Sequence, residues 1–210
     1  MSVDWMIYLD CRLQGRAGWS RNAVELPCYG HGMSTAEQAL EQQRYPVGRF
    51  TIPAQVTADE RREAIAVLES FPRLFRQEVE SRGDAGLERP YRPGGWTLRQ
   101  LAHHVADSHS QAAGRLRMAL TEEWPTVKPY DEAAWANLVD ATTLPVGPSL
   151  AVIDGVHLRM VTLLRSLKDA DWAKGYNHPE NGRERVDQVV LRYAWHSRHH
   201  LAHARAVSLN

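Results

Sequence analysis

The chain has 210 residues, of which 43% are hydrophobic and 24% are charged, as is usual for a soluble globular protein. Its 25 basic and 25 acidic residues give a formal net charge of zero at pH 7. Proteins that bind nucleic acids usually carry a basic face or stripe, so this balance argues against a nucleic-acid partner. The sequence has no run of about 18 apolar residues, so we expect neither a transmembrane helix nor a membrane partner.

The start of the chain and its two cysteines bear on the cellular compartment. Asp4 and Asp10 stand where a signal peptide would have a basic start, and no apolar block follows them. Cys11 and Cys28 do not form a CxxC pair, and we interpret them as reduced and incidental, with a disulfide as the alternative. The expected location is therefore the cytoplasm.

Residues 1–44 differ from the rest of the chain, because they are rich in glycine and polar residues and show no sustained hydrophobic period. We predict a poorly ordered or irregular extension here. The alternative is a natural start near Met33, which would remove most of this stretch. His31 falls within it and is interpreted as incidental. Residues 45–210 are expected to form one domain.

Four stretches with helical hydrophobic spacing follow in chain order. The sequence TADE at 57–60 places a threonine three residues before a glutamate, a capping-box pattern that opens the first helix. The same pattern at Thr97 opens a second helix, which runs to about Leu120. The later predicted elements are a short helix within 131–139, a long helix over 150–167 and a last helix over 186–207.

The arrangement of these elements indicates an all-α fold. No segment shows the alternating pattern of a confident β-strand. Four long helices joined by connections of medium length favour a four-helix bundle. We expect long crossover connections and one short extra helix.

The second predicted helix carries three histidines within the sequence HHVADSH at 103–109. A helical projection that advances about 100° per residue places His104 at the edge of the core-facing side. His103 points nearly the opposite way, toward solvent, and His109 lies on the other flank. His104 is therefore the best candidate to face a site, and His109 is the second.

The last predicted helix carries four histidines in eight positions, within AWHSRHHLAH at 194–203. They form one stripe with apolar neighbours, while the arginines lie opposite, so we expect the histidines to face inward. His196 and His200 have i, i+4 spacing, and so do His199 and His203. This spacing brings two imidazoles onto adjacent turns, where both can reach one ion. It does not choose between the two pairs.

Two histidines of the last helix and one of the second helix would make a three-histidine metal site. An ion with four ligands would then keep one position for water or substrate, which is typical of a catalytic site. Imidazole ligands suit zinc, nickel, copper and iron, so they do not choose the metal. The alternatives are solvated or capping histidines and a histidine-lined pocket without metal. His157 and His178 are interpreted as structural.

Polar and aromatic residues near this site are candidates to line a pocket. Asp107 lies three residues after His104, and its alternative role is to orient a ligand imidazole. Tyr193 shares the histidine stripe, although a buried tyrosine more often serves packing. The catalytic residues, including a general base, stay unassigned. The other candidates are Tyr130, Asp131, Trp135 and Trp195.

A resemblance to a known family lies in the stretches YRPGGWTLRQLAHHVADSH, RMALTEEWPTVKPYDEAAW, YNHPENG and YAWHSRHHLAH. With YPVGRF at 45–50, they closely resemble the YfiT-like branch of the DinB superfamily over residues 45–207. The resemblance implies a DinB-like four-helix bundle, often a homodimer, with one divalent metal held by three histidines. Zn²⁺ is the first expectation and Ni²⁺ the second. Carried over by motif, the ligands are His104, His196 and His200.

The resemblance also implies a class of reaction. Members of the branch are described as metal-dependent hydrolases, in which the ion lowers the pKa of bound water. Relatives include transferases that join a low-molecular-weight thiol, such as bacillithiol, to an electrophile through a reactive thiolate. A metal-binding or ligand-binding module without turnover is the third hypothesis. We expect a small-molecule substrate, which the residues do not identify.

Overall fold

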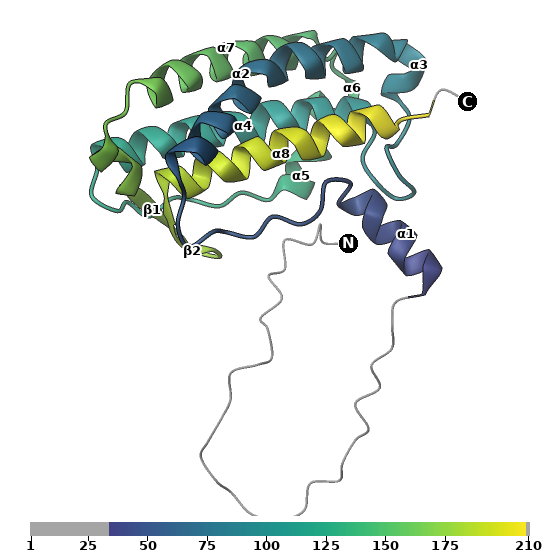
Figure 1. Cartoon of the computed structure of the whole chain (residues 1–210). Helices are drawn as coiled ribbons and strands as arrows, with labels where there is room; N and C mark the ends of the chain where they lie inside the picture. The colour runs from purple at the N-terminus through teal and green to yellow at the C-terminus, as the bar shows by residue number, and fades with distance from the viewer. Residues whose placement is uncertain (1–33, 209–210) are drawn as a thin grey trace, which may run out of the picture.

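The computed structural model describes residues 34–208, and these residues form a bundle of four long helices (Figure 1). The predicted all-α four-helix bundle is confirmed. No helix in the described range is both long and apolar enough to cross a membrane. The long helices are α2 (Ala58–Ser81), α4 (Leu98–Thr121), α7 (Gly147–Arg165) and α8 (Val186–Ala206).

The starts of α2 and α4 follow from their capping boxes, as predicted. The Thr57 hydroxyl accepts from the Glu60 backbone N–H at 3.2 Å, and the Glu60 carboxylate accepts from the Thr57 N–H at 2.7 Å. Thr97 and Gln100 make the same reciprocal pair at the start of α4. Each box satisfies two N–H groups that a helix end would otherwise leave without partners.

The order of the helices in space explains the long connections. Helix α2 packs against α7 and α8, and α4 packs against the same two helices, so α2 and α4 lie diagonally opposite each other. The chain therefore crosses a diagonal between α2 and α4, and crosses another between α7 and α8. The predicted crossover connections are confirmed.

The interior of the bundle has two apolar clusters with histidines between them. On α4, α7 and α8 the members of one cluster occupy one end of the helix and those of the other cluster the opposite end. His109, His157, His196 and His200 fall in the gap between the two. We call these four residues, together with the neighbouring His104, the histidine layer.

The connections contain short elements that hydrophobic periodicity does not predict. The expected single helix within 131–139 is two separate helical turns. The structure also contains a β-hairpin where the sequence predicts no strand, and its second strand begins at Gly182, which has a positive φ of 76°. The strand sequences GYNH and GRER do not alternate apolar and polar residues, so periodicity did not reveal them and this expectation was wrong. The short elements are α3 (Gly83–Leu87), α5 (Glu132–Ala136), α6 (Val139–Thr143), the 3₁₀ helix η1 (Asp169–Ala173), and the antiparallel strands β1 (Gly175–His178) and β2 (Gly182–Arg185).

The expectation of an irregular extension is wrong for its last ten residues. Helix α1 (Thr35–Arg44) starts at a capping box in which the Ser34 hydroxyl accepts from the Glu37 N–H at 3.2 Å. No residue of α1 is buried, so the helix lacks the apolar stripe that identifies helices in a sequence. The expectations about His31, Met33 and the two cysteines concern residues outside the described range.

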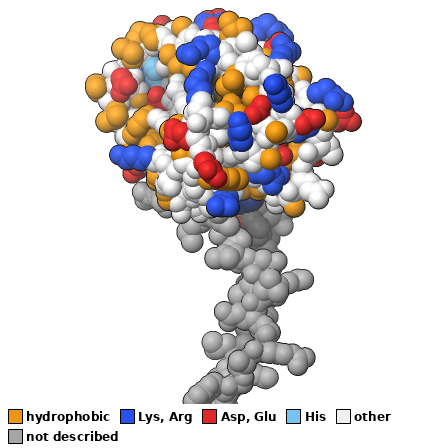
Figure 2. Space-filling view, turned by 90° about the vertical axis from the view of Figure 1, so that its left-hand side faces the viewer, with side chains coloured by type: hydrophobic (Ala, Val, Ile, Leu, Met, Phe, Trp, Pro, Cys, Tyr) orange, Lys and Arg blue, Asp and Glu red, His pale blue; other side chains and the backbone are white. Residues whose placement is uncertain are grey.

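The surface agrees with the balanced charge of the chain. On the face shown in Figure 2, basic and acidic side chains are interspersed with apolar ones, and neither sign gathers into one continuous area. This mixture is typical of a water-exposed surface.

Candidate metal centre

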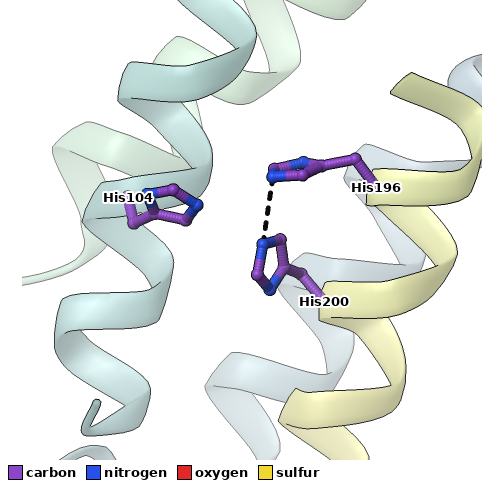
Figure 3. Close-up of side chains that lie close together, drawn as sticks. All are labelled: His104, His196 and His200. Carbon is purple, nitrogen blue, oxygen red and sulfur yellow. Dashed lines mark hydrogen bonds between the residues drawn. The ribbon is translucent and has the colours of Figure 1, made fainter. Parts of the chain in front are cut away.

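Three histidines from two helices point toward one another in the histidine layer (Figure 3). His104 extends from α4, and His196 and His200 extend from adjacent turns of α8. One ring nitrogen from each lies within 4.8 Å of the other two. The Nε2 atoms of His196 and His200 are 3.0 Å apart. The three residues are only 4%, 3% and 5% exposed, so their rings meet inside the bundle.

Burial makes these three rings neutral at physiological pH. Burial, followed by the charge that a protonated His203 would carry, lowers the pKa of His104 to about 3. Burial, followed by the neighbouring histidines, holds the pKa values of His196 and His200 well below the usual range. A neutral imidazole has a free lone pair, which is the form that binds a metal ion. The three residues therefore have the chemistry and the proximity to hold a divalent ion.

A second group of three histidines lies on α8 alone. His199, His200 and His203 also offer ring nitrogens within 4.8 Å of one another. His203 Nε2 is 3.1 Å from the Gln43 carbonyl oxygen, and His199 stacks on Trp195 with ring centroids 4.6 Å apart. The structure thus brings together both pairs that the sequence left open, with His200 common to the two groups.

Two further histidines lie beside His196 in the layer. His109 Nε2 is 2.9 Å from His196 Nδ1, and His109 Nδ1 is 2.7 Å from His157 Nε2. His157 Nδ1 is in turn 2.6 Å from the Leu68 carbonyl oxygen. The sequence ranked His109 second as a site residue and assigned His157 a structural role. The sequence signal for His157 was its place among the apolar residues of α7. That signal did not reveal which residues its ring contacts.

The prediction that His103 faces solvent is wrong. His103 is only 6% exposed, and its ring nitrogens lie 2.7 Å from the Ser149 hydroxyl and 3.2 Å from the Leu144 carbonyl oxygen. The segment that follows α6 covers this side of α4. A helical projection treats a helix in isolation and does not include such a cover. His178, interpreted as structural, ends β1 and accepts from the Glu180 N–H at 3.3 Å.

The predicted pocket residues on α4 and α8 have different surroundings. Asp107 is half-buried, and burial followed by the nearby Asp140 raises its pKa to about 6. The Tyr193 ring meets His109 edge-on at 5.2 Å and lies 5.7 Å from the His196 ring. Tyr193 therefore packs against the histidine layer.

The remaining predicted pocket residues make contacts outside the three-histidine group. The Tyr130 and Trp135 rings pack with centroids 4.5 Å apart. Asp131 is exposed and caps α5 by accepting from the Ala134 N–H at 2.9 Å. The Trp195 indole donates to the Gly48 carbonyl oxygen at 2.9 Å.

Two aromatic residues of the loop before α4 contact the site and were missed in the sequence. Trp96 is tilted against His104 with ring centroids 4.7 Å apart, and Tyr91 stacks on His203 at 4.1 Å. A backbone bridge between Pro90 and Thr97 closes the loop that carries them. The available signal was their position just before the capping box of α4.

Comparisons with known proteins show which family this chain is similar to. A family model described as the DinB superfamily matches residues 67–204. A protein of Bacillus mycoides named "Putative metal-dependent hydrolase" is 43% identical over 164 residues, which cover 78% of this chain and 94% of that protein. A protein of Oceanobacillus iheyensis with the same name is 43% identical over 161 residues, covering 77% and 93%.

A solved structure shares the fold. YfiT from Bacillus subtilis, described as "a probable metal-dependent hydrolase with an unusual four-helix bundle topology", matches with a TM-score of 0.77 and 39% identity. The match covers 80% of this chain and 96% of YfiT. The family match at residues 67–204 includes all of α4 and α7 and nearly all of α8, the helices that carry the histidine layer.

Proposed function

Because this chain belongs to the DinB superfamily, as its motifs predicted, we propose that it is a metal-dependent hydrolase whose single divalent ion is held by His104, His196 and His200. The observation that carries the proposal is the meeting of three buried, neutral imidazoles from two rigid helices. The names of the relatives from Bacillus mycoides and Bacillus subtilis support the class of reaction.

The donor set fits the proposed ion. Three imidazoles suit Zn²⁺, our first candidate, and also Ni²⁺, and they leave a position of a four-coordinate ion free. An ion of this kind supplies a nucleophile from water at neutral pH. The protein itself contributes neutral ligands, fixed orientation on α4 and α8, and a surrounding from which bulk water is excluded. The depth of the site favours a small-molecule substrate.

The first test is the metal content of the full chain, measured by elemental mass spectrometry after purification without chelator. Wild type should carry about one zinc or nickel per chain, and His104→Ala should carry almost none. His103→Ala is the matched control, because His103 is the adjacent buried histidine with partners outside the group. Wild type without stoichiometric metal, or full metal content in His104→Ala, would contradict the proposal.

The second test separates hydrolysis from thiol transfer. Metal-loaded protein is assayed against esters and amides in ¹⁸O-labelled water, with and without a low-molecular-weight thiol. Hydrolysis should place ¹⁸O in the product at a rate that does not depend on the thiol. Thiol-dependent consumption of an electrophile without incorporation of ¹⁸O would overturn the hydrolase assignment.

A further inference from the structure

Two hydrogen-bonded chains of imidazoles lead away from the proposed metal ligands on α8, and each ends at a backbone carbonyl. The first chain runs from His196 through His109 and His157 to the Leu68 oxygen, with separations of 2.9, 2.7 and 2.6 Å. A carbonyl oxygen can only accept a hydrogen bond, and a neutral imidazole carries only one N–H. The carbonyl at the end therefore determines the position of every hydrogen along the chain.

The assignment starts at Leu68 and moves inward. His157 Nδ1 must donate to the Leu68 oxygen, so His157 Nε2 is an acceptor. His109 then donates from Nδ1 to His157 and accepts at Nε2. The donor to His109 is His196 Nδ1, which leaves the lone pair of His196 on Nε2. Both rings are fully buried, which disfavours a charged imidazole, so each carries a single N–H, as the chain requires.

The second chain reaches the same result for His200. His203 Nε2 donates to the Gln43 oxygen at 3.1 Å, so His203 Nδ1 is an acceptor. The His200 Nδ1 atom, 3.3 Å away, supplies the hydrogen, and the lone pair of His200 is left on Nε2. Two unrelated carbonyls, one on α2 and one at the end of α1, thus select the same tautomer in both rings.

The two lone pairs face each other. His196 Nε2 and His200 Nε2 lie 3.0 Å apart, and in these tautomers neither nitrogen has a hydrogen to share with the other. Two facing lone pairs repel, and a cation that both can bind relieves the repulsion. We propose that His109, His157 and His203 are positioning residues, which fix the tautomers of His196 and His200 so that both Nε2 atoms are ready to bind a metal. This inference rests on the proposed function.

The chains also distinguish between the two groups of three histidines that could hold an ion. His200 Nδ1 carries a hydrogen and His203 Nδ1 accepts it, so these two nitrogens have no lone pair left for an ion. His203 supports the site, and does not bind the metal. Ligand histidines usually donate to a carboxylate, a carbonyl or water. Here the connection to the carbonyl is made by neutral imidazoles, so these chains add no negative charge that would weaken the ion as a Lewis acid.

The first test needs no substitution and no metal. In ¹⁵N-labelled, metal-free full-length protein, two-bond ¹H–¹⁵N correlation spectra distinguish Nδ1–H from Nε2–H rings. His109, His157, His196 and His200 should be Nδ1–H, and His203 should be Nε2–H. An Nε2–H tautomer at His196 or His200 would overturn the proposal.

The second test measures Zn²⁺ affinity by competition with a chelating dye, with helical content recorded by circular dichroism. His109→Leu removes the acceptor of His196 and should weaken affinity about 10- to 100-fold, the usual effect of losing such a partner. His109→Gln should recover most of the affinity, because its amide can donate to His157 and accept from His196. His103→Leu removes another buried histidine of α4, whose partners lie outside the chain of imidazoles, and should bind like wild type.

The outcomes separate the two proposals. Wild-type affinity in a folded His109→Leu protein, with one zinc per chain in wild type, would overturn the positioning role and leave the proposed function intact. Equal losses in His109→Leu and His109→Gln would overturn it as well, because a merely structural contact would not be recovered by an amide. Wild type that binds no metal would overturn the proposed function and the positioning role together.

Discussion

The apolar clusters of the bundle and the histidine layer between them are both buried, but different forces hold them. Residues such as Phe75 and Leu116 in the clusters are held by burial of apolar surface, which has no direction and tolerates exchange for a side chain of similar volume. Within the layer, His109, His157 and His196 are held by directional hydrogen bonds, in which each ring must present the correct nitrogen. The clusters therefore account for the fold, and the layer accounts for the site.

The largest expected difference between the apolar clusters and the histidine layer is their effect on folding stability at low pH. Burial lowers the pKa of His104 to about 3 and that of His157 to about 4, whereas the unfolded chain binds these protons near pH 6.5. The stability contributed by the neutral rings is complete above pH 6.5. For each such histidine it falls by about 1.4 kcal/mol per pH unit between pH 6.5 and the folded pKa of that ring.

We therefore expect metal-free protein to unfold cooperatively between about pH 6 and pH 4, as followed by circular dichroism. Zinc-loaded protein should unfold at lower pH, because the ion competes with protons for the same nitrogens. Unchanged urea stability of the metal-free protein from pH 7 to pH 4 would contradict this expectation.

A substitution in an apolar cluster should reduce stability and spare the site. Phe75 is fully buried, and Phe75→Ala should lower the free energy of unfolding by about 3–5 kcal/mol through lost burial and a cavity. Urea denaturation measures this loss. Zinc content at 10 °C should stay at the wild-type level, and its loss from the folded variant would show that the two regions are coupled.

A pair of substitutions on α8 distinguishes a metal ligand from a residue that only positions a ligand. His200→Ala removes a proposed ligand and should weaken zinc binding by more than 100-fold, or about 2.7 kcal/mol. His203→Ala should weaken it about tenfold, as expected for a supporting partner. Dye competition gives both values. The reverse order, with the larger loss in His203→Ala, would assign the site to His199, His200 and His203.

The smallest expected effect on stability concerns the half-buried carboxyl of Asp107 on α4. The pKa of the Asp107 carboxyl in the folded protein, about 6, lies above its unfolded value near 4. Its favourable contribution is therefore present below pH 4 and is lost as the pH rises through 6. Asp107→Asn should be about 1–2 kcal/mol more stable than wild type at pH 7 and equal to it near pH 4, as measured by urea denaturation. A destabilised variant at pH 7 would show that the charged carboxylate has a stabilising partner.

The elements that the sequence predicted are those with a local signal. Capping boxes at Thr57 and Thr97 and apolar stripes identified the long helices. A helical projection placed His104 at the edge of a core-facing side and all four histidines of the last helix on one inward stripe, and the family resemblance selected His196 and His200. What failed depends on residues distant in the chain. His103 is buried by contact with Ser149, and His157 contacts His109, both far away in the sequence. The hydrophobic periodicity of one helix does not predict contacts with another.

The hydrogen bond from His203 to the Gln43 carbonyl has a consequence for where the working unit of this protein begins. Periodicity and family motifs start at Tyr45, and a truncation at that residue would keep all four bundle helices. It would also remove the acceptor that orients His203, and through it His200. A chain that starts at Tyr45 should therefore fold into the four helices and still bind zinc poorly. The helical bundle and the oriented metal ligands require different first residues.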